Sequence, residues 1–161
     1  MEIIWAPWRA KYVQKKIKEK GCLFCKHLKR KREKSLFLFE SKFSLVLLNA
    51  FPYNNGHLLI APKKHVSSLE KLKEEELLDL TKTVKKMLTI LRRVLKPDGF
   101  NIGINIGKEA GAGIDKHLHI HIVPRWRGDV NFMPICFNTK VIPQSLKEVA
   151  QKLKRCLQEK K

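Results

Sequence analysis

Residues 116–126 read Lys-His-Leu-His-Ile-His-Ile-Val-Pro-Arg-Trp, with histidines at three alternate positions, 117, 119 and 121. A β-strand sends successive side chains to opposite faces, so this pattern predicts a strand with three imidazoles on its open face and aliphatic residues on the other. A helix would scatter the three histidines around its axis instead. We expect the strand to end at Pro124, because proline has no N–H to give to a ladder.

Half of the chain's six histidines lie within these five residues. A packed structural role for all three, or a metal site made of these three alone, are the alternatives to catalysis. We favour a catalytic role for at least one of them, because a neutral imidazole acts as a nucleophile without losing a proton and needs only orientation.

The run His-Leu-His-Ile-His-Ile-Val resembles the motif of the histidine-triad superfamily, which consists of nucleotide hydrolases and transferases that act at an α-phosphate. Matches extend over most of residues 43–127 and more loosely over residues 3–25. The resemblance implies an α+β, HIT-like fold, with an antiparallel sheet of about five strands, one long helix and a C-terminal helix. It also implies that His119 is the nucleophile, that His121 contacts the phosphoryl oxygens and that His117 is held in place.

A length of 161 residues predicts a single domain over residues 1–161. We divide it into a basic N-terminal arm with a Cys-x-x-Cys loop (1–34), a catalytic core (35–127) and a C-terminal helix (143–159). No run of 18 or more apolar residues predicts a membrane span. The first residues lack the basic start and long apolar core of a signal peptide, so we expect a cytoplasmic protein with reduced thiols.

Short apolar runs bounded by turn residues predict the remaining strands. They cover Ser35–Glu40, Phe43–Asn49, His57–Pro62 and Phe100–Ile106. Apolar residues that step by three or four predict one long amphipathic helix, Glu74–Leu95, which Pro97 and the following Asp-Gly should end.

The formal net charge is +19, and residues 9–34 carry twelve of the 34 basic side chains against two acidic ones. Such a field attracts a polyphosphate substrate, and it equally attracts RNA. Charge alone does not separate these partners. We therefore keep RNA binding through the arm as a secondary hypothesis, behind a solvated basic arm.

Cys22 and Cys25 form a Cys-x-x-Cys pair, in which two thiolates can meet one metal ion within a tight turn. A thioredoxin-like redox pair is the alternative, but no helical run or βαβ pattern follows it at the right place. In related bacterial triad proteins the pair binds zinc together with a His after the second core strand and the first His of the triad. That resemblance implies a structural zinc site made of Cys22, Cys25, His65 and His117, with His27 as a substitute ligand.

The same resemblance assigns residues that bind the substrate. Asn49 is expected to bind the ribose, His57 to lie near the triad and the phosphate, and Asn105 to contact the nucleotide. Three glycines in residues 107–113 let backbone N–H groups approach an anion, and Gly111 and Gly113 take that role. Trp126 is expected to stack on a base or on a partner subunit.

The sequence thus predicts an enzyme that cleaves dinucleoside polyphosphates, such as diadenosine tetraphosphate, through a nucleotidyl-histidine intermediate. Features of both hydrolysis and phosphorolysis are present, and the sequence does not choose between them. A nucleoside phosphoramidate hydrolase and a zinc-stabilised nucleic-acid-binding module without catalysis are the alternatives. The superfamily pairs two such sheets, which implies a homodimer.

Overall fold

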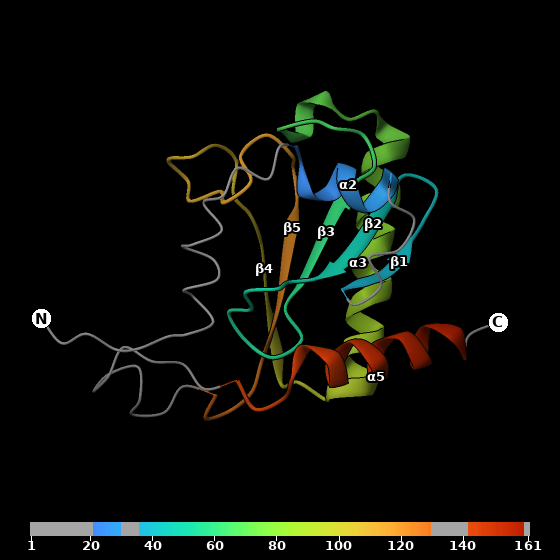
Figure 1. Ribbon diagram of the computed structural model, residues 1–161, viewed down its shortest axis with the longest axis vertical. Coiled ribbons are helices and arrows are strands. Elements are labelled where there is room, and N and C mark those ends of the chain that lie inside the picture. Colours follow the sequence, from blue (N-terminus) through green and yellow to red (C-terminus); the bar gives the residue numbers. More distant parts are fainter. Residues whose placement is uncertain (1–20, 30–35, 130–141, 160–161) are drawn as a thin grey trace, which may run out of the picture.

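The computed structural model describes residues 21–29, 36–129 and 142–159, and the expectations for residues 1–20 and 30–35 of the basic arm lie outside these ranges. Five strands form one sheet, in which every neighbouring pair is antiparallel and the order is β1-β2-β3-β5-β4 (Figure 1). Their bounds are Phe37–Glu40 (β1), Ser44–Leu48 (β2), Leu58–Pro62 (β3), Gly99–Ile104 (β4) and Ile120–Arg125 (β5). The predicted α+β class and the number of strands are confirmed.

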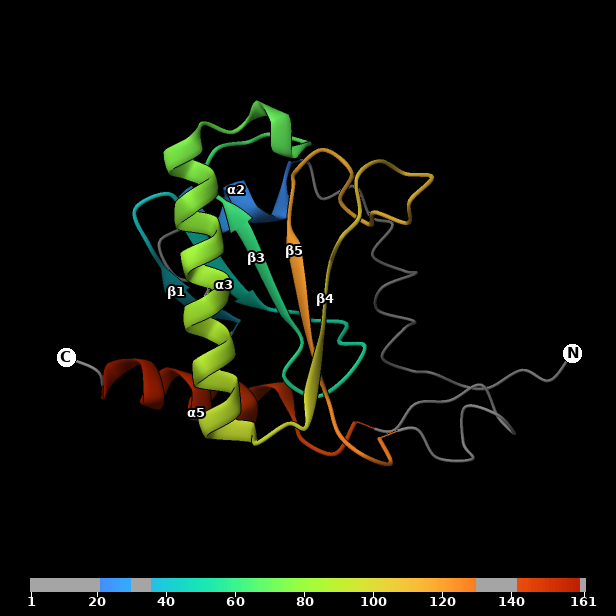
Figure 2. The ribbon, with the colours of Figure 1, turned by 180° about the vertical axis from the view of Figure 1, so that it is seen from behind.

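Two long helices cover one face of the sheet, and a short helix lies over the other (Figures 1 and 2). The long helices are α3 (Glu74–Leu95) and α5 (Leu146–Gln158), and the short one is α2 (Leu23–Lys29). A 3-10 turn, η1 (Leu69–Lys71), precedes α3. Among the described helices, none has both the length and the apolar composition needed to cross a membrane.

The strands separate two apolar clusters because their side chains alternate between the faces. In β2 and β3 every residue is buried, so these two strands form the centre of the sheet. Val46, Leu58, Ile60 and Ile122 face α3 and α5 and build the main core with them. Leu45, Leu47, Leu59 and Ala61 face α2 and pack around Phe24. One face of these strands therefore builds the main core with α3 and α5, and the opposite face lies toward α2.

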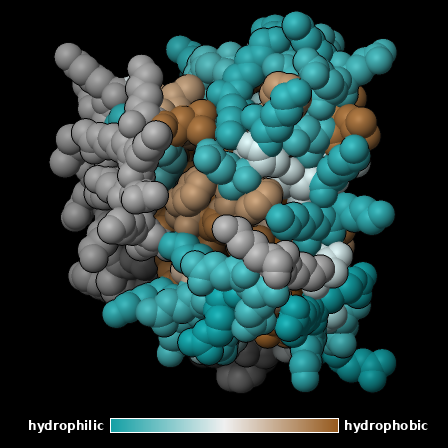
Figure 3. Space-filling view, turned by 90° about the vertical axis from the view of Figure 1, so that its right-hand side faces the viewer, coloured by the Kyte–Doolittle hydropathy of each residue, from teal (hydrophilic) through white to brown (hydrophobic). Residues whose placement is uncertain are grey.

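Helix α3 has the predicted bounds, and it ends with Lys96 in the left-handed conformation (φ 48°), directly before Pro97. Its buried residues are Leu80, Thr83, Met87, Ile90 and Leu91. Ser145 caps the N-terminus of helix α5: its side chain accepts a hydrogen bond from the N–H of Glu148 and forms a capping box with that residue. Figure 3 shows the side of the molecule at the right of Figure 1, where hydrophilic side chains surround a smaller hydrophobic area.

The structure corrects the prediction for the histidine strand. Strand β5 begins only at Ile120, so His117 and His119 precede it, and it continues through Pro124 to Arg125. Pro124 is tolerated because the pairing of β5 with β3 has already ended at Ile122. On its other side, β5 still pairs with β4 as far as Arg125. The Pro124 carbonyl instead accepts a hydrogen bond from the side chain of Asn54 (2.9 Å).

A second correction concerns the cysteine pair. Helix α2 starts at Leu23 and contains Cys25, although we expected no helix at this place. The helix is short, and its Phe24 side chain is fully buried under it. Burial of this ring holds the helix against the sheet, which the local sequence pattern alone does not reveal.

Candidate functional site

The three histidines of the triad point to the face of the sheet that α2 covers. The Phe24 ring centroid lies 4.9 Å from that of His117 and 5.3 Å from that of His119, and the His119 and His121 centroids are 4.9 Å apart. The predicted row of imidazoles is therefore present. The expected open face is wrong for two of them, since His117 is fully buried and His119 is 3% exposed. Only His121, which is half-buried, lies toward solvent.

His119 is oriented by a hydrogen bond to the backbone. Its Nδ1 lies 2.8 Å from the carbonyl oxygen of His117, and a carbonyl can only accept. Nδ1 therefore carries the proton, and Nε2 keeps its lone pair. Burial lowers the pKa of His119 below its ordinary value, so the ring is neutral near pH 7. A neutral imidazole with a lone pair on Nε2 is a form that can act as a nucleophile.

His57 and His121 form a relay whose proton positions follow from a single backbone donor. The N–H of Tyr53 donates to Nδ1 of His57 (3.0 Å), and the side-chain amide of Asn49 lies 3.2 Å from the same nitrogen. His57 must then carry its proton on Nε2, which donates to Nδ1 of His121 (2.9 Å). His121 in turn carries its proton on Nε2 and can donate it outward.

The relay is neutral because both rings are poorly solvated. Burial, followed by the nearby imidazoles of His121 and His119, lowers the pKa of His57 to about 3. Burial, followed by His119, lowers the pKa of His121 to about 4. Neither ring is charged near pH 7, so each can donate one hydrogen bond and accept another.

The predicted metal ligands come together as one cluster. Nδ1 or Sγ atoms of Cys22, Cys25, His65 and His117 all lie within 4.8 Å of one another. Four of their separations are 3.1, 3.1, 3.3 and 3.7 Å. Ligands at zinc bonding distance in a tetrahedron lie about 3.3–3.8 Å apart, which is close to these four separations. Among the described residues, the substitute ligand His27 is not in this cluster.

The tautomer of His117 also fits a metal. Its Nε2 lies 2.8 Å from the carbonyl oxygen of Pro62 and must donate to it, so Nδ1 faces the cysteines with a lone pair. Two thiolates and two imidazoles are a donor set that zinc prefers. His117 thus joins two functions, since its side chain belongs to the metal cluster and its carbonyl orients His119.

The glycine loop follows β4 directly. Gly107 and Gly111 have φ values of 85° and 83°, which only glycine adopts at low cost. The N–H of Gly111 donates to the carbonyl of Lys108 (2.9 Å), and that of Ala112 donates to Gly107 (3.2 Å), so these two amides shape the loop itself. Asn105 lies just beyond β4, and its side chain reaches the carbonyl of Gly111 (3.5 Å). Gly113 lies exposed in the same loop.

The structure does not bring Trp126 to the histidines of its own chain. Trp126 follows β5, and its indole N–H donates to the carbonyl of Lys96 at the end of α3 (3.2 Å). It lies five positions after His121, which is about 17 Å along an extended strand. The neighbouring Arg125 is held by Asp129 (2.7 and 2.9 Å) and by Asn101 (2.9 Å). Both expected roles of Trp126, stacking on a base or on a partner subunit, stay predictions.

Our sequence reasoning missed Phe24 and Tyr53. Phe24 sits inside the Cys-x-x-Cys spacing and covers two triad rings. Tyr53 stacks on His121, with centroids 5.8 Å apart and an angle of 14° between the ring planes, and it packs against His57 at 4.7 Å. Both residues lie within the quoted motifs, but the periodicity of a sequence does not predict which ring a side chain in a loop will contact.

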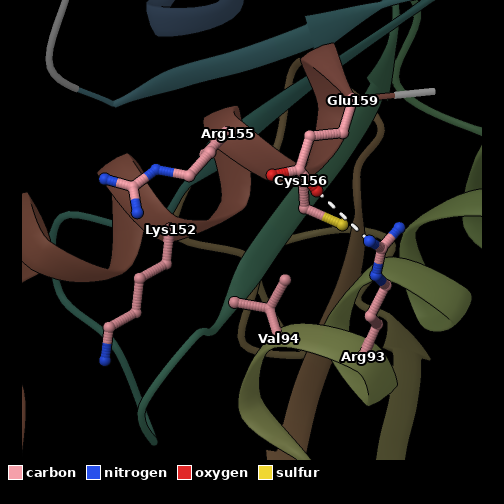
Figure 4. Close-up of a pocket in the computed structure, with 6 residues that line it drawn as sticks. All are labelled: Arg93, Val94, Lys152, Arg155, Cys156 and Glu159. Carbon is pink, nitrogen blue, oxygen red and sulfur yellow. Dashed lines mark hydrogen bonds and ion pairs between the residues drawn. The ribbon is translucent and has the colours of Figure 1, made fainter. Parts of the chain in front are cut away.

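A hollow of about 240 Å³ lies between α3 and α5, away from the histidines (Figure 4). Six residues line it: Arg93, Val94, Lys152, Arg155, Cys156 and Glu159. In Figure 4 the side chains of Lys152 and Arg155 point away from Arg93, which pairs with Glu159 (3.2 Å). Its cations do not converge, so we assign it no ligand.

Comparison with known proteins agrees with this geometry. Residues 30–128 match the HIT domain family. The chain is 41% identical over 121 residues to a protein of Mycobacterium tuberculosis named AP-4-A phosphorylase, covering 75% of this chain and 62% of that protein. It is 35% identical over 95 residues to a Schizosaccharomyces pombe protein named bis(5'-nucleosyl)-tetraphosphatase [asymmetrical], covering 59% of this chain and 52% of that protein. The chain therefore spans less than two thirds of either relative.

Among solved structures, a zinc-bound histidine triad family protein from Mycobacterium smegmatis superposes with a TM-score of 0.70 at 27% identity. The superposition covers 86% of this chain and 94% of that one. The matched residues 30–128 include all five strands and the triad. The chain belongs to the HIT domain family.

Proposed function

We propose that this protein cleaves dinucleoside polyphosphates at an α-phosphate, through a nucleotidyl-histidine intermediate on His119. The observation that carries the proposal is the 2.8 Å bond from His119 Nδ1 to the His117 carbonyl, which presents Nε2 as a nucleophile. The names of the relatives in Mycobacterium tuberculosis and Schizosaccharomyces pombe support this class of substrate.

In the first step, Nε2 of His119 attacks the α-phosphorus in line. A P–N bond forms, and the bond from phosphorus to the bridging oxygen of the leaving nucleotide breaks. His121, which is held by His57, donates from Nε2 to the phosphoryl oxygens or to the leaving oxygen. Because the reaction is mostly a matter of position and charge, fixed tautomers lower the cost of reaching the transition state.

In the second step, an acceptor oxygen replaces His119 on phosphorus. Water as the acceptor gives a nucleoside monophosphate, and inorganic phosphate gives a nucleoside diphosphate. The His119 ring returns to its neutral form, with Nδ1 still bound to the His117 carbonyl. The same residues serve both acceptors, so the choice between hydrolysis and phosphorolysis is a question for product analysis.

The remaining site residues are proposed to bind substrate. Asn49 follows β2 beside His57 and is assigned the ribose. Asn105, Gly111 and Gly113 lie in the loop next to the triad and are assigned the nucleotide and its phosphates. Trp126 is assigned to a partner subunit, since it lies far along β5 from the histidines of its own chain.

We also propose that Cys22, Cys25, His65 and His117 hold a zinc ion. The spacing of the four donor atoms and the zinc-bound solved relative support it. When bound, zinc supplies a structural cross-link between the start of α2, the segment after β3 and the triad, and no chemistry on the substrate. Thiolate ligands require reducing conditions, which supports a cytoplasmic location.

A homodimer is the assembly we propose. Strand β4 is at the edge of the sheet, and within the described part of the chain it pairs only with β5. Ile102 in this strand is 49% exposed and Ile106 just beyond it is 45% exposed, an apolar edge that favours pairing with a second copy. Sedimentation velocity should show a dimer that Ile102→Lys dissociates, and a monomeric wild type would contradict this.

Product analysis on diadenosine tetraphosphate tests the proposed activity. AMP plus ATP in the presence and absence of inorganic phosphate would identify a hydrolase, and ADP plus ATP only with phosphate would identify a phosphorylase. Absence of turnover under both conditions would overturn the proposal and direct the search to nucleoside phosphoramidates. Mass spectrometry of acid-sensitive, nucleotide-labelled protein should place the intermediate on His119.

A further inference from the structure

The rings of the site form a continuous series with a closed end and an open end. Phe24 is fully buried, His119 is 3% exposed, His121 is half-buried and Tyr53 is 58% exposed. Consecutive centroids are 5.3, 4.9 and 5.8 Å apart. Helix α2 and the metal cluster close the Phe24 end, so a group that moves past His121 toward solvent meets Tyr53.

The position of Tyr53 is imposed by its own backbone, because its N–H donates to Nδ1 of His57. One face of the ring stacks nearly parallel on His121, and the residue is 58% exposed, so we take the opposite face of the ring as the one open to solvent. Folding gains little from the burial of a tyrosine that stays more than half exposed. A planar ligand on the open face would account for keeping an aromatic residue at this position.

We propose that the open face of Tyr53 stacks on the base of the leaving nucleotide. This rests on the proposed function, in which a dinucleoside polyphosphate is attacked by His119 and a nucleoside polyphosphate departs beside His121. Tyr53 lies two ring spacings from the nucleophile, and a flexible polyphosphate can span that distance. Every base presents a flat π surface, so this subsite recognises that a second nucleoside is present but does not distinguish one base from another.

Two substrates that share the attacked adenylyl group isolate this contact. Diadenosine tetraphosphate releases ATP on attack, whereas adenosine 5′-tetraphosphate releases inorganic triphosphate and has no second base. We expect the wild type to show a higher kcat/KM for the first substrate. Tyr53→Ala should remove this preference by lowering kcat/KM for diadenosine tetraphosphate about 5- to 150-fold, the range of one base–aromatic stack, with kcat/KM for adenosine 5′-tetraphosphate unchanged.

Two further variants separate stacking from support of the relay. Tyr53→Phe keeps the ring face and should retain the preference, and Phe51→Ala removes a neighbouring ring that is 38% exposed and should also retain it. An equal loss on both substrates in Tyr53→Ala would overturn the proposal, because the ring would then act only through His121. A wild type without preference, a loss in Tyr53→Phe, or an equal loss in Phe51→Ala would overturn it as well. A wild type that turns over neither substrate would instead refute the proposed activity itself.

Discussion

The two ends of the histidine row use the same side chain in opposite ways. At the metal end, His117 donates from Nε2 to the Pro62 carbonyl and turns Nδ1 toward two cysteines and His65. At the substrate end, His119 donates from Nδ1 and His121 accepts at Nδ1, so both present Nε2 to the substrate. Residue type and spacing are identical along the row. The partner of the second ring nitrogen decides which function each histidine has.

The comparison also shows how the ends are joined. The carbonyl that orients His119 belongs to His117, whose side chain is in the metal cluster. Breaking the substrate end should therefore leave the metal end intact, whereas breaking the metal end should disturb both.

The largest effect is expected from His119→Ala. Removing the nucleophile should lower kcat for diadenosine tetraphosphate by a factor on the order of 10⁴ or more, with the bound zinc and the circular dichroism spectrum unchanged. His27→Ala, which changes a histidine outside both ends, should keep nearly full activity. If His119→Ala retained more than about 10⁻² of the wild-type rate, another residue would have to be the nucleophile.

A smaller effect is expected from Cys25→Ser. Loss of a thiolate should abolish stoichiometric zinc, measured by inductively coupled plasma mass spectrometry, and lower kcat/KM about 10- to 100-fold because the His117 carbonyl is no longer held. Cys156→Ala serves as the matched control, since Cys156 packs in the α3–α5 core and is outside the cluster. Full activity in a zinc-free Cys25→Ser protein would show that the two ends are independent.

The smallest effect concerns the pH dependence of stability. His57 and His121 have folded-state pKa values of about 3 and about 4, below their ordinary 6.5, so the unfolded chain binds more protons as the pH falls below about 6.5. The free energy of unfolding should therefore be highest above pH 6.5 and should fall between about pH 6.5 and pH 4. Each buried neutral histidine contributes a slope of at most about 1.4 kcal/mol per pH unit.

Urea unfolding at a series of pH values measures this slope. His57→Gln should make the slope shallower by the contribution of one histidine. An unchanged slope in His57→Gln would mean that the relay does not hold its rings neutral in the folded protein.

Much of the fold could be predicted from the sequence because it depends on local patterns. The 3.6-residue period of the apolar side chains predicted α3 with its observed bounds. The central strands were placed to within a residue, because runs such as Leu-Leu-Ile-Ala-Pro are buried on both faces. The prediction was wrong where tertiary contacts act: β5 extends through Pro124 because β3 has stopped pairing, and α2 forms because Phe24 is buried.

The sequence by itself determined which residue types are available, an alternating row of histidines, a Cys-x-x-Cys pair and a glycine loop, since these are properties of neighbouring positions. Only the tertiary structure decided the tautomer of each ring and the openness of each end. Those depend on the carbonyl of Pro62, the ring of His57 and the ring of Phe24, which lie 55, 64 and 95 positions from the histidines that they contact. A hydrogen bond or a ring contact acts over a few ångströms, and folding alone brings such distant residues that close.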